Sequence, residues 1–160
     1  MSSGDKFVEI NGVDELNELI KNFKASQKRS IWISTTRLAA KPLVKAMKSN
    51  ANSKHSGKSG RFAKSHGNSP SRTKMSLKVG ARAKNKGHQA HLLNSGTKDR
   101  SYTTKNGKIH RTGKVKASKY FDNAYNSKIR EVEGNIAESF STSVSKFIAR
   151  AEKRAAKNKK

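Results

Sequence analysis

The stretch SKYFDNAYNSKIREVEGNIAESFSTSVSKFIARAEKR, residues 118–154, decides the fold. Apolar side chains recur in it at steps of mostly three or four residues, which places them on one face of a helix. Ser118 is a candidate N-cap, and Gly134 is a weak point inside the pattern. The members of the apolar stripe are Phe121, Tyr125, Ile129, Val132, Ile136, Phe140, Val144, Phe147, Ile148 and Ala151. The pattern predicts a long amphipathic helix at the C-terminal end.

The N-terminal residues predict a strand followed by a helix. Phe7, Val8 and Ile10 precede the turn pair Asn11-Gly12, which indicates a short strand over residues 6–10. The apolar residues of 13–24 then follow a helical period, with acids in the first turn.

The next segment, residues 30–49, favours a longer helix. Pro42 interrupts its apolar pattern, so this helix is expected to kink or divide there.

The middle of the chain is polar and contains fewer predicted elements. Residues 50–73, rich in Ser, Asn, Gly, Lys and His, are expected to form a basic loop or arm. Alternating residues predict a strand over 74–82 and a second strand over 89–93. Residues 98–116 read as a polar hairpin or loop around Asn106-Gly107.

These elements together predict an α+β fold. We expect a single domain over residues 1–160, with a small, mostly antiparallel sheet packed against two or three helices. Extended basic loops and a basic tail, residues 153–160, complete it. Only 32% of the chain is apolar and 6% is aromatic, so the core of one copy should be thin and burial would finish against neighbouring subunits.

Charge is concentrated in the middle of the chain. The formal net charge is +25, and residues 24–119 contain 25 Lys or Arg and one acid, Asp99. A like-charged segment of this kind is typical of a protein that meets a polyanion. Lys outnumbers Arg by 26 to 10, which favours diffuse phosphate contact over base-specific reading. A solvated loop whose charge gives only solubility is the alternative.

No constellation of residues supports catalysis. His88, His91 and His110 lack nearby carboxylates other than Asp99, and no nucleophile elbow or phosphate loop occurs. We therefore expect no enzyme activity, no cofactor and no metal site. The chain has no cysteines and no apolar run of membrane-spanning length, so we expect no disulfide and no membrane partner.

Two groups of residues are candidates for function. Phosphate-based, salt-sensitive contact needs exposed cations outside the predicted core. The candidate DNA- or partner-facing residues are Lys54, Lys58, Arg61, Lys64, Arg72, Lys105, Lys108 and Arg111. The candidate assembly residues are the aromatics of the last helix, Phe121, Tyr125, Phe140 and Phe147.

The order of the elements resembles a family of tailed-phage neck or tail-completion proteins. This family is typified by the Hong Kong 97-type head–tail virion morphogenesis protein and is similar to the minor tail protein Z of phage lambda. Its likeness lies in FVEINGVDELNELIKNF (7–23), AAKPLVKAMKSNA (39–51), TKMSLKVGA (73–81), HLLNSGTKDR (91–100) and residues 116–154. The chain departs from the family in a longer, more basic segment after the second helix. It also has Asn94-Ser95 where an acid often precedes the Gly-Thr element.

The resemblance implies a structural virion protein made in the host cytoplasm. It implies a ring-forming subunit, sixfold by expectation, between a neck connector and the tail or tail-terminator proteins, with genomic DNA in its channel. The thin core and the lysine-rich surface agree with this hypothesis. The alternative is a non-specific nucleic-acid-binding protein of the cell, ribosome-associated or nucleoid-type, which would remain monomeric.

Overall fold

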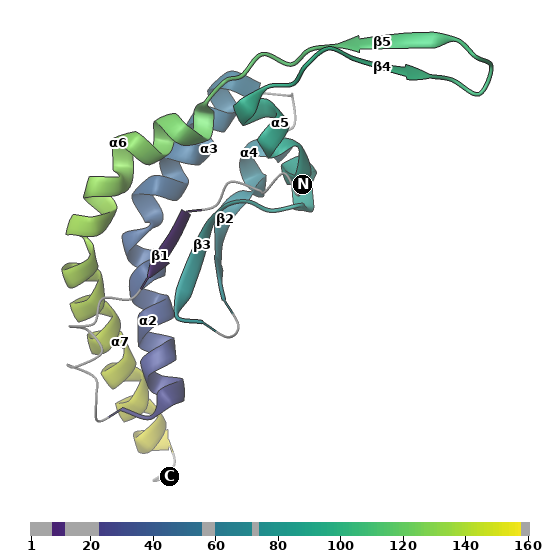
Figure 1. Ribbon diagram of the computed structural model, residues 1–160. Coiled ribbons are helices and arrows are strands. Elements are labelled where there is room, and N and C mark those ends of the chain that lie inside the picture. Colours follow the sequence, from purple (N-terminus) through teal and green to yellow (C-terminus); the bar gives the residue numbers. More distant parts are fainter. Residues whose placement is uncertain (1–7, 12–22, 56–59, 72–73, 158–160) are drawn as a thin grey trace. The chain divides into compact units, whose positions relative to one another are not determined.

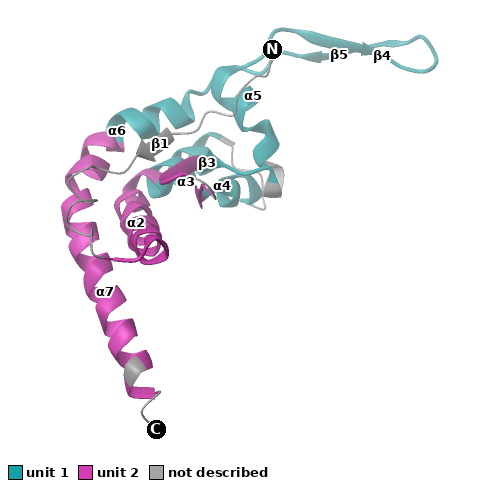
Figure 2. Ribbon diagram, turned by 60° about the horizontal axis from the view of Figure 1, so that its bottom comes forward, with its two compact units in different colours: residues 1–7, 44–67, 80–127 teal, residues 8–43, 68–79, 128–160 magenta. Residues whose placement is uncertain are grey.

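The computed structural model describes residues 8–11, 23–55, 60–71 and 74–157 (Figure 1). It has an α+β fold with a long C-terminal helix, as the sequence predicts. The chain divides into two compact units made of discontinuous segments (Figure 2). Unit 1 combines residues 1–7, 44–67 and 80–127, and unit 2 combines residues 8–43, 68–79 and 128–160. The single domain of residues 1–160 stays a prediction.

The secondary structure consists of α-helices, one 3-10 helix and five strands within the described residues. The helices are α2 (Ala25–Ala39), α3 (Lys41–His55), α4 (Arg61–Ser65), η1 (Lys84–Gln89), α5 (Ala90–Ser95), α6 (Tyr120–Gly134) and α7 (Ile136–Lys157). The strands are β1 (Val8–Asn11), β2 (His66–Pro70), β3 (Ser76–Ala81), β4 (Arg100–Thr103) and β5 (Ile109–Gly113). The helix predicted over residues 13–24 falls almost wholly outside the described residues.

Unit 2 is built on the packing of α2 against α7, which run side by side in Figures 1 and 2. One face of α2 is buried, and its members Ile31, Trp32 and Thr35 follow the helical period. The buried Thr35 hydroxyl donates to the carbonyl oxygen of Ile31 at 2.9 Å, so its burial leaves no unpaired group. The Ser143 hydroxyl of α7 donates to the Ser34 hydroxyl of α2 at 3.1 Å. This contact joins the two helices directly.

The three-stranded sheet has the order β1-β3-β2. Strand β1 is antiparallel to β3, with Val8 opposite Val79 and Ile10 opposite Leu77. Leu77 and Val79 are buried while Lys78 between them is exposed, as the sequence predicts. The predicted alternation fails beyond these residues, because Ser76 and Gly80 are buried too.

Pro42 divides the predicted helix of residues 30–49, as expected. Helix α2 ends at Ala39, and α3 begins at Lys41 with Pro42 in its first turn. Proline is tolerated there because the first-turn N–H groups have no partner within the helix. The last helix is divided in the same way. Helix α6 ends at Gly134 and α7 begins at Ile136, so the predicted single helix is wrong but its weak point is where the break occurs.

The prediction of a loop over residues 50–73 is wrong for most of the residues in this range that the structure describes. Helix α3 continues to His55, and α4 and β2 occupy residues 61–70. The cause is an aromatic cluster of Phe62, His66 and Tyr120, with ring centroids 5.0–5.6 Å apart in edge-on arrangement. The His66 Nε2 atom lies 2.9 Å from the Tyr120 hydroxyl, and its Nδ1 atom lies 3.0 Å from the Phe62 carbonyl oxygen. The cluster buries a histidine, which a search for apolar periodicity overlooks.

The strand predicted over residues 89–93 is also wrong, because these residues belong to η1 and α5. Gly87 permits the tight path, since a Cβ atom there would lie 1.7 Å from the carbonyl oxygen of Arg82. A short apolar run such as Ala90 to Leu93 fits either a strand or a helix by pattern alone. The close approach of η1 to the backbone of Arg82 favours the helix over the strand at these residues.

The start of α6 is capped by Asn94 of α5 rather than by Ser118. The Asn94 side chain is 2% exposed, and its Oδ1 atom accepts a hydrogen bond from the Phe121 backbone N–H at 2.9 Å. Its Nδ2 atom donates to Asp122 Oδ2 at 3.1 Å. Ser118 instead donates its hydroxyl hydrogen to the Leu93 carbonyl oxygen at 2.7 Å. The buried amide therefore joins the end of α5 to the first turn of α6.

We predict that Asn94→Ala lowers the free energy of unfolding by about 1–3 kcal/mol, because it removes a helix cap and the buried partner of Asp122. Asn94→Asp should be at least as harmful, since it sets two carboxylates together. The double variant Asn94→Asp with Asp122→Asn restores one amide and one carboxylate and should recover part of the loss. Urea unfolding of the four proteins measures this. A double variant no better than Asn94→Asp would contradict the assigned pair.

Burial makes His66 a source of pH dependence. It lowers the pKa of His66 below its ordinary 6.5, so the folded protein resists a proton that the unfolded chain accepts. Stability from the neutral ring is present above pH 6.5 and is lost as pH falls through the lowered folded pKa.

We therefore predict that the free energy of unfolding falls as the pH is lowered through and below 6.5, by at most about 1.4 kcal/mol per pH unit from this one proton. His66→Gln keeps a polar group but cannot titrate, so its curve should be flatter over the same range. Denaturant unfolding at several pH values compares the two proteins. Equal slopes would show that His66 is not responsible.

Candidate nucleic-acid interface

Strands β4 and β5 form an antiparallel hairpin that extends away from α5 within unit 1 (Figure 1). Its turn is formed by residues 104–107, in which Gly107 has φ +74° and donates its backbone N–H to the Thr104 carbonyl oxygen at 2.9 Å. Of the predicted hairpin or loop, the hairpin is present, but the central residues of its turn are Lys105 and Asn106 instead of the predicted pair Asn106-Gly107. Nearly every residue of both strands is exposed, so the hairpin covers no core.

The base of the hairpin is held by the Gly-Thr pair that follows α5. Gly96 has φ +76°, and a Cβ atom there would lie 2.9 Å from both the Ala117 nitrogen and the Val115 carbonyl oxygen. Thr97 donates its backbone N–H to the Val115 carbonyl oxygen at 2.9 Å, and its hydroxyl accepts from the Val115 N–H at 2.9 Å. The motif HLLNSGTKDR thus orients the hairpin through Gly96 and Thr97 and caps α6 through Asn94.

The hairpin and its flanks are strongly basic. Residues 98–116 contain seven cations and one acid, Asp99. The cations are Lys98, Arg100, Lys105, Lys108, Arg111, Lys114 and Lys116. Within the described part of the chain, the structure gives none of them an ion pair. Two exposed strands with this charge form an elongated positive surface, which suits the phosphates of a nucleic acid.

The two faces of the hairpin carry different side chains. Tyr102 and His110 are paired across the strands and stack on each other, with ring centroids 5.6 Å apart and planes at 15°. The other face carries the pairs Ser101 with Arg111 and Thr103 with Ile109. Tyr102 is 56% exposed and Ile109 is 69% exposed. Each face of the hairpin thus exposes one large apolar side chain beside its polar residues.

The structure brings together only some of the predicted DNA- or partner-facing residues. Lys105, Lys108 and Arg111 all lie on the hairpin and are exposed. The exposed Lys54, Arg61 and Lys64 lie elsewhere, on α3 and α4. Lys58 and Arg72 lie outside the described residues. The hairpin is therefore the best-defined basic surface among the candidates.

The predicted assembly residues differ in exposure. Phe121 is only 6% exposed and belongs to the core of unit 1, so it is not available for assembly. Tyr125, Phe140 and Phe147 are half-buried. Phe147 makes an edge-on contact with Phe23, with ring centroids 5.9 Å apart. An assembly role for these three remains a prediction.

Sequence reasoning missed a second basic surface, in unit 2. A groove beside α2 is lined by Arg29, Arg37 and Lys41 and by Arg150 of α7. The signal was available, because residues 29, 33, 37 and 41 are spaced by four and share one face of a helix. Sequence reasoning considered only the apolar stripe on the other side of the same helix and therefore did not identify this basic face.

Two further features concern metals and membranes. Among the residues described, no group of three His, Asp or Glu side chains is placed to hold a metal ion. The described helices include none that is both long enough and apolar enough to cross a bilayer.

Comparison of the chain with known protein families, with curated proteins and with solved structures found no match.

We predict that the hairpin can be removed without unfolding the protein. Replacing residues 99–113 by a short Gly-Ser linker keeps Thr97 and Val115, whose backbone bonds close the base. The deleted strands bury little, so the melting temperature should change by no more than a few degrees. Gly96→Ala is the matched contrast, because the added Cβ atom meets backbone and should lower the melting temperature much more. A large loss on hairpin removal would show that the hairpin supports the core.

Proposed function

We propose that the chain is a structural subunit of a tailed-phage neck, a tail-completion or head–tail joining protein without catalysis. Its basic hairpin would contact genomic DNA in the channel of a homo-oligomeric ring. Neighbouring connector and tail or tail-terminator proteins would bind its other surfaces.

The observation that carries the proposal is the exposed hairpin with seven cations and one acid over residues 98–116. Its cations are five Lys and two Arg, and Lys binds phosphate as a point charge without reading bases. Contact with DNA of any sequence is what a channel subunit requires. A two-stranded hairpin is marginally stable alone, so a bound partner would also stabilise it.

The family resemblance supports the rest of the proposal. The segments that carry it, residues 91–100 above all, have a clear part in this fold. Gly96 and Thr97 of the Gly-Thr element set the base of the hairpin. The α+β fold and the long C-terminal helix agree with what the resemblance implies. Ring formation, and the sixfold symmetry expected for it, come from the resemblance alone.

A cellular nucleic-acid-binding protein is the second candidate. The same hairpin favours it, since diffuse phosphate contact serves a ribosome-associated or nucleoid protein equally well. The two candidates differ in assembly. A neck subunit should form an oligomer of one defined size, whereas the cellular binder should remain a monomer.

The first experiment measures the salt dependence of binding to a short DNA duplex by fluorescence anisotropy. We predict that binding is independent of sequence. Changing Arg100, Lys105, Lys108 and Arg111 to Gln should lower the slope of log K against log salt by up to about four, at roughly 0.9 per phosphate contact.

A matched control removes the same charge elsewhere. Arg130, Lys146, Lys153 and Arg154 are exposed and lie in α6 and α7, and their change to Gln also removes two Arg and two Lys. This control should leave the slope close to that of the natural protein. Equal losses in both variants would mean that only net charge matters and would contradict the hairpin as the interface.

The second experiment measures mass by analytical ultracentrifugation without nucleic acid and with a partner ring. A single discrete oligomer supports the neck subunit. A monomer under all conditions, with DNA binding intact, would favour the cellular candidate instead.

A further inference from the structure

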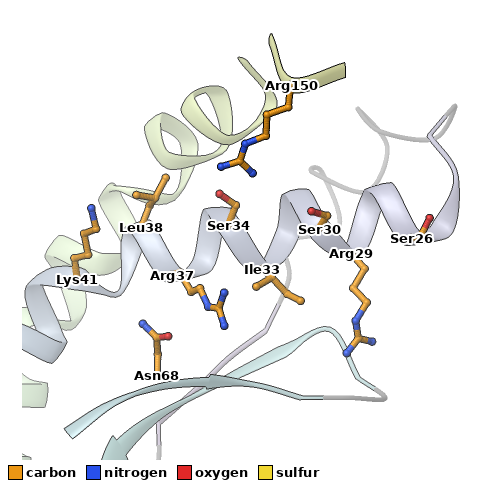
Figure 3. A pocket seen from close by; sticks show the side chains of 10 residues that line it. All are labelled: Ser26, Arg29, Ser30, Ile33, Ser34, Arg37, Leu38, Lys41, Asn68 and Arg150. Carbon is orange, nitrogen blue, oxygen red and sulfur yellow. The ribbon is translucent and has the colours of Figure 1, made fainter. Parts of the chain in front are cut away.

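A groove of about 660 Å³ runs along α2 in unit 2 (Figure 3). One stripe of α2 forms its floor, and Asn68 of β2 and Arg150 of α7 stand at its sides. The α2 residues that line it are Ser26, Arg29, Ser30, Ile33, Ser34, Arg37 and Leu38, followed by Lys41 at the start of α3. The part of the stripe that lies on α2, from Ser26 to Leu38, extends for roughly 18 Å at the helical rise. Its length suits an extended ligand better than a small molecule.

The groove is held open by contacts on both sides of α2. The opposite face of the helix is buried, which fixes the rotation of α2 about its axis. The hydrogen bond between Ser143 and Ser34 sets α7 beside it, and Arg29 donates to the carbonyl oxygen of Ser71 near β2. The walls are therefore positioned by the fold.

Among the described residues, the charged side chains that line the groove are all cations: four cations and no acid. The side chains of Arg37, Lys41 and Arg150 make no hydrogen bond or ion pair with any other residue that the structure describes. Figure 3 shows Arg37 directed toward Asn68 and Arg150 directed toward Ser34. Cations gathered without acids repel one another, and a bound anion would relieve that repulsion.

The kind of cation narrows the ligand class. Three of the four cations are Arg, although the chain as a whole has 26 Lys and 10 Arg. The guanidinium group forms two parallel hydrogen bonds with a carboxylate or a phosphate, which a Lys ammonium cannot do. The groove is thus chemically different from the lysine-rich hairpin.

The apolar side chains of the groove favour a ligand that carries carboxylates over one that carries phosphates. Ile33 and Leu38 are half-buried and lie among the cations. A peptide can offer carboxylates and apolar side chains together, whereas a nucleic-acid strand offers phosphates, sugars and bases. The described residues that line the groove include no aromatic side chain that could stack on a base.

We propose that this groove binds an acidic peptide segment of a partner protein. Carboxylates of the segment pair with Arg37 and Arg150, and an apolar side chain covers Ile33. The site lies wholly in unit 2 and does not depend on the role given to the hairpin.

The test uses the full chain and three fluorescent probes near physiological salt. The first probe is a synthetic 16-residue peptide. Its Glu residues, and likewise its Leu residues, recur at spacings that alternate between three and four positions. The second has Gln in place of every Glu, and the third is a single-stranded oligonucleotide with the same number of charges. We expect the acidic peptide to bind and the Gln peptide to bind at least tenfold more weakly.

Two double charge reversals locate the site. Arg37→Glu with Arg150→Glu should weaken the acidic peptide by tenfold or more, since two charge-assisted contacts become repulsive, and should leave the oligonucleotide nearly unchanged. Arg100→Glu with Arg111→Glu on the hairpin makes the same change in net charge. It should weaken the oligonucleotide and leave the peptide nearly unchanged. Melting curves check that both variants remain folded.

Ile33→Ser tests the apolar contact separately. It keeps every charge and should weaken the acidic peptide severalfold without affecting the oligonucleotide.

Three results would overturn the proposal. If both charge reversals weaken peptide binding equally, the peptide is attracted by net charge alone. If the groove reversal abolishes binding of the oligonucleotide and not of the peptide, the groove is a nucleic-acid site. A concentration-dependent increase in mass that the groove reversal abolishes, with no peptide binding, would make a second copy of this chain the occupant.

Discussion

Repulsion between like charges is the constraint that shapes this structure. The chain has 36 Lys or Arg and only 11 Asp or Glu, so most cations have no acid to pair with. The ion pair between Lys128 and Glu131 joins half-exposed side chains one helical turn apart, and such pairs contribute little to stability. The protein therefore keeps its cations at the surface and must stabilise its core by other means.

The core of unit 1 is stabilised by hydrogen bonds of two buried side chains that are not cations, His66 and Asn94. His66 stays uncharged because burial lowers its pKa, and it bridges the Tyr120 hydroxyl and the Phe62 carbonyl. Asn94 satisfies both ends of its amide at the start of α6. These contacts let a chain with few aromatic residues build a specific interior, because unpaired alternatives would leave buried groups unsatisfied. Among the described residues, these hydrogen bonds use no cation of the hairpin and none of the α2 groove.

The sequence predicts those parts of the fold that depend on local pattern. The presence of a hairpin around Asn106, the division at Pro42 and the burial of Leu77 and Val79 all follow from local chemistry. Prediction from the sequence fails where contacts between residues far apart in the chain determine the local structure. The residues near Phe62 in the sequence give no sign that it packs against Tyr120. The sequence therefore predicts a loop where the structure has helix α4 and strand β2.

The same division holds for the candidate sites. Lys105, Lys108 and Arg111 were predicted because their cations stand in an evidently polar segment. The α2 groove was missed because Arg29 and Arg37 share a helix with a buried apolar face, and because Arg150 reaches the groove from a helix distant in sequence.

The most direct test of this account is a map of where DNA binds, read from amide chemical shifts in ¹⁵N-labelled protein as a short duplex is added. The account predicts that the largest shifts fall within residues 98–116, with little change along α2. Shifts concentrated in the α2 groove, or spread evenly over all basic surfaces, would contradict the assignment of the hairpin as the nucleic-acid interface.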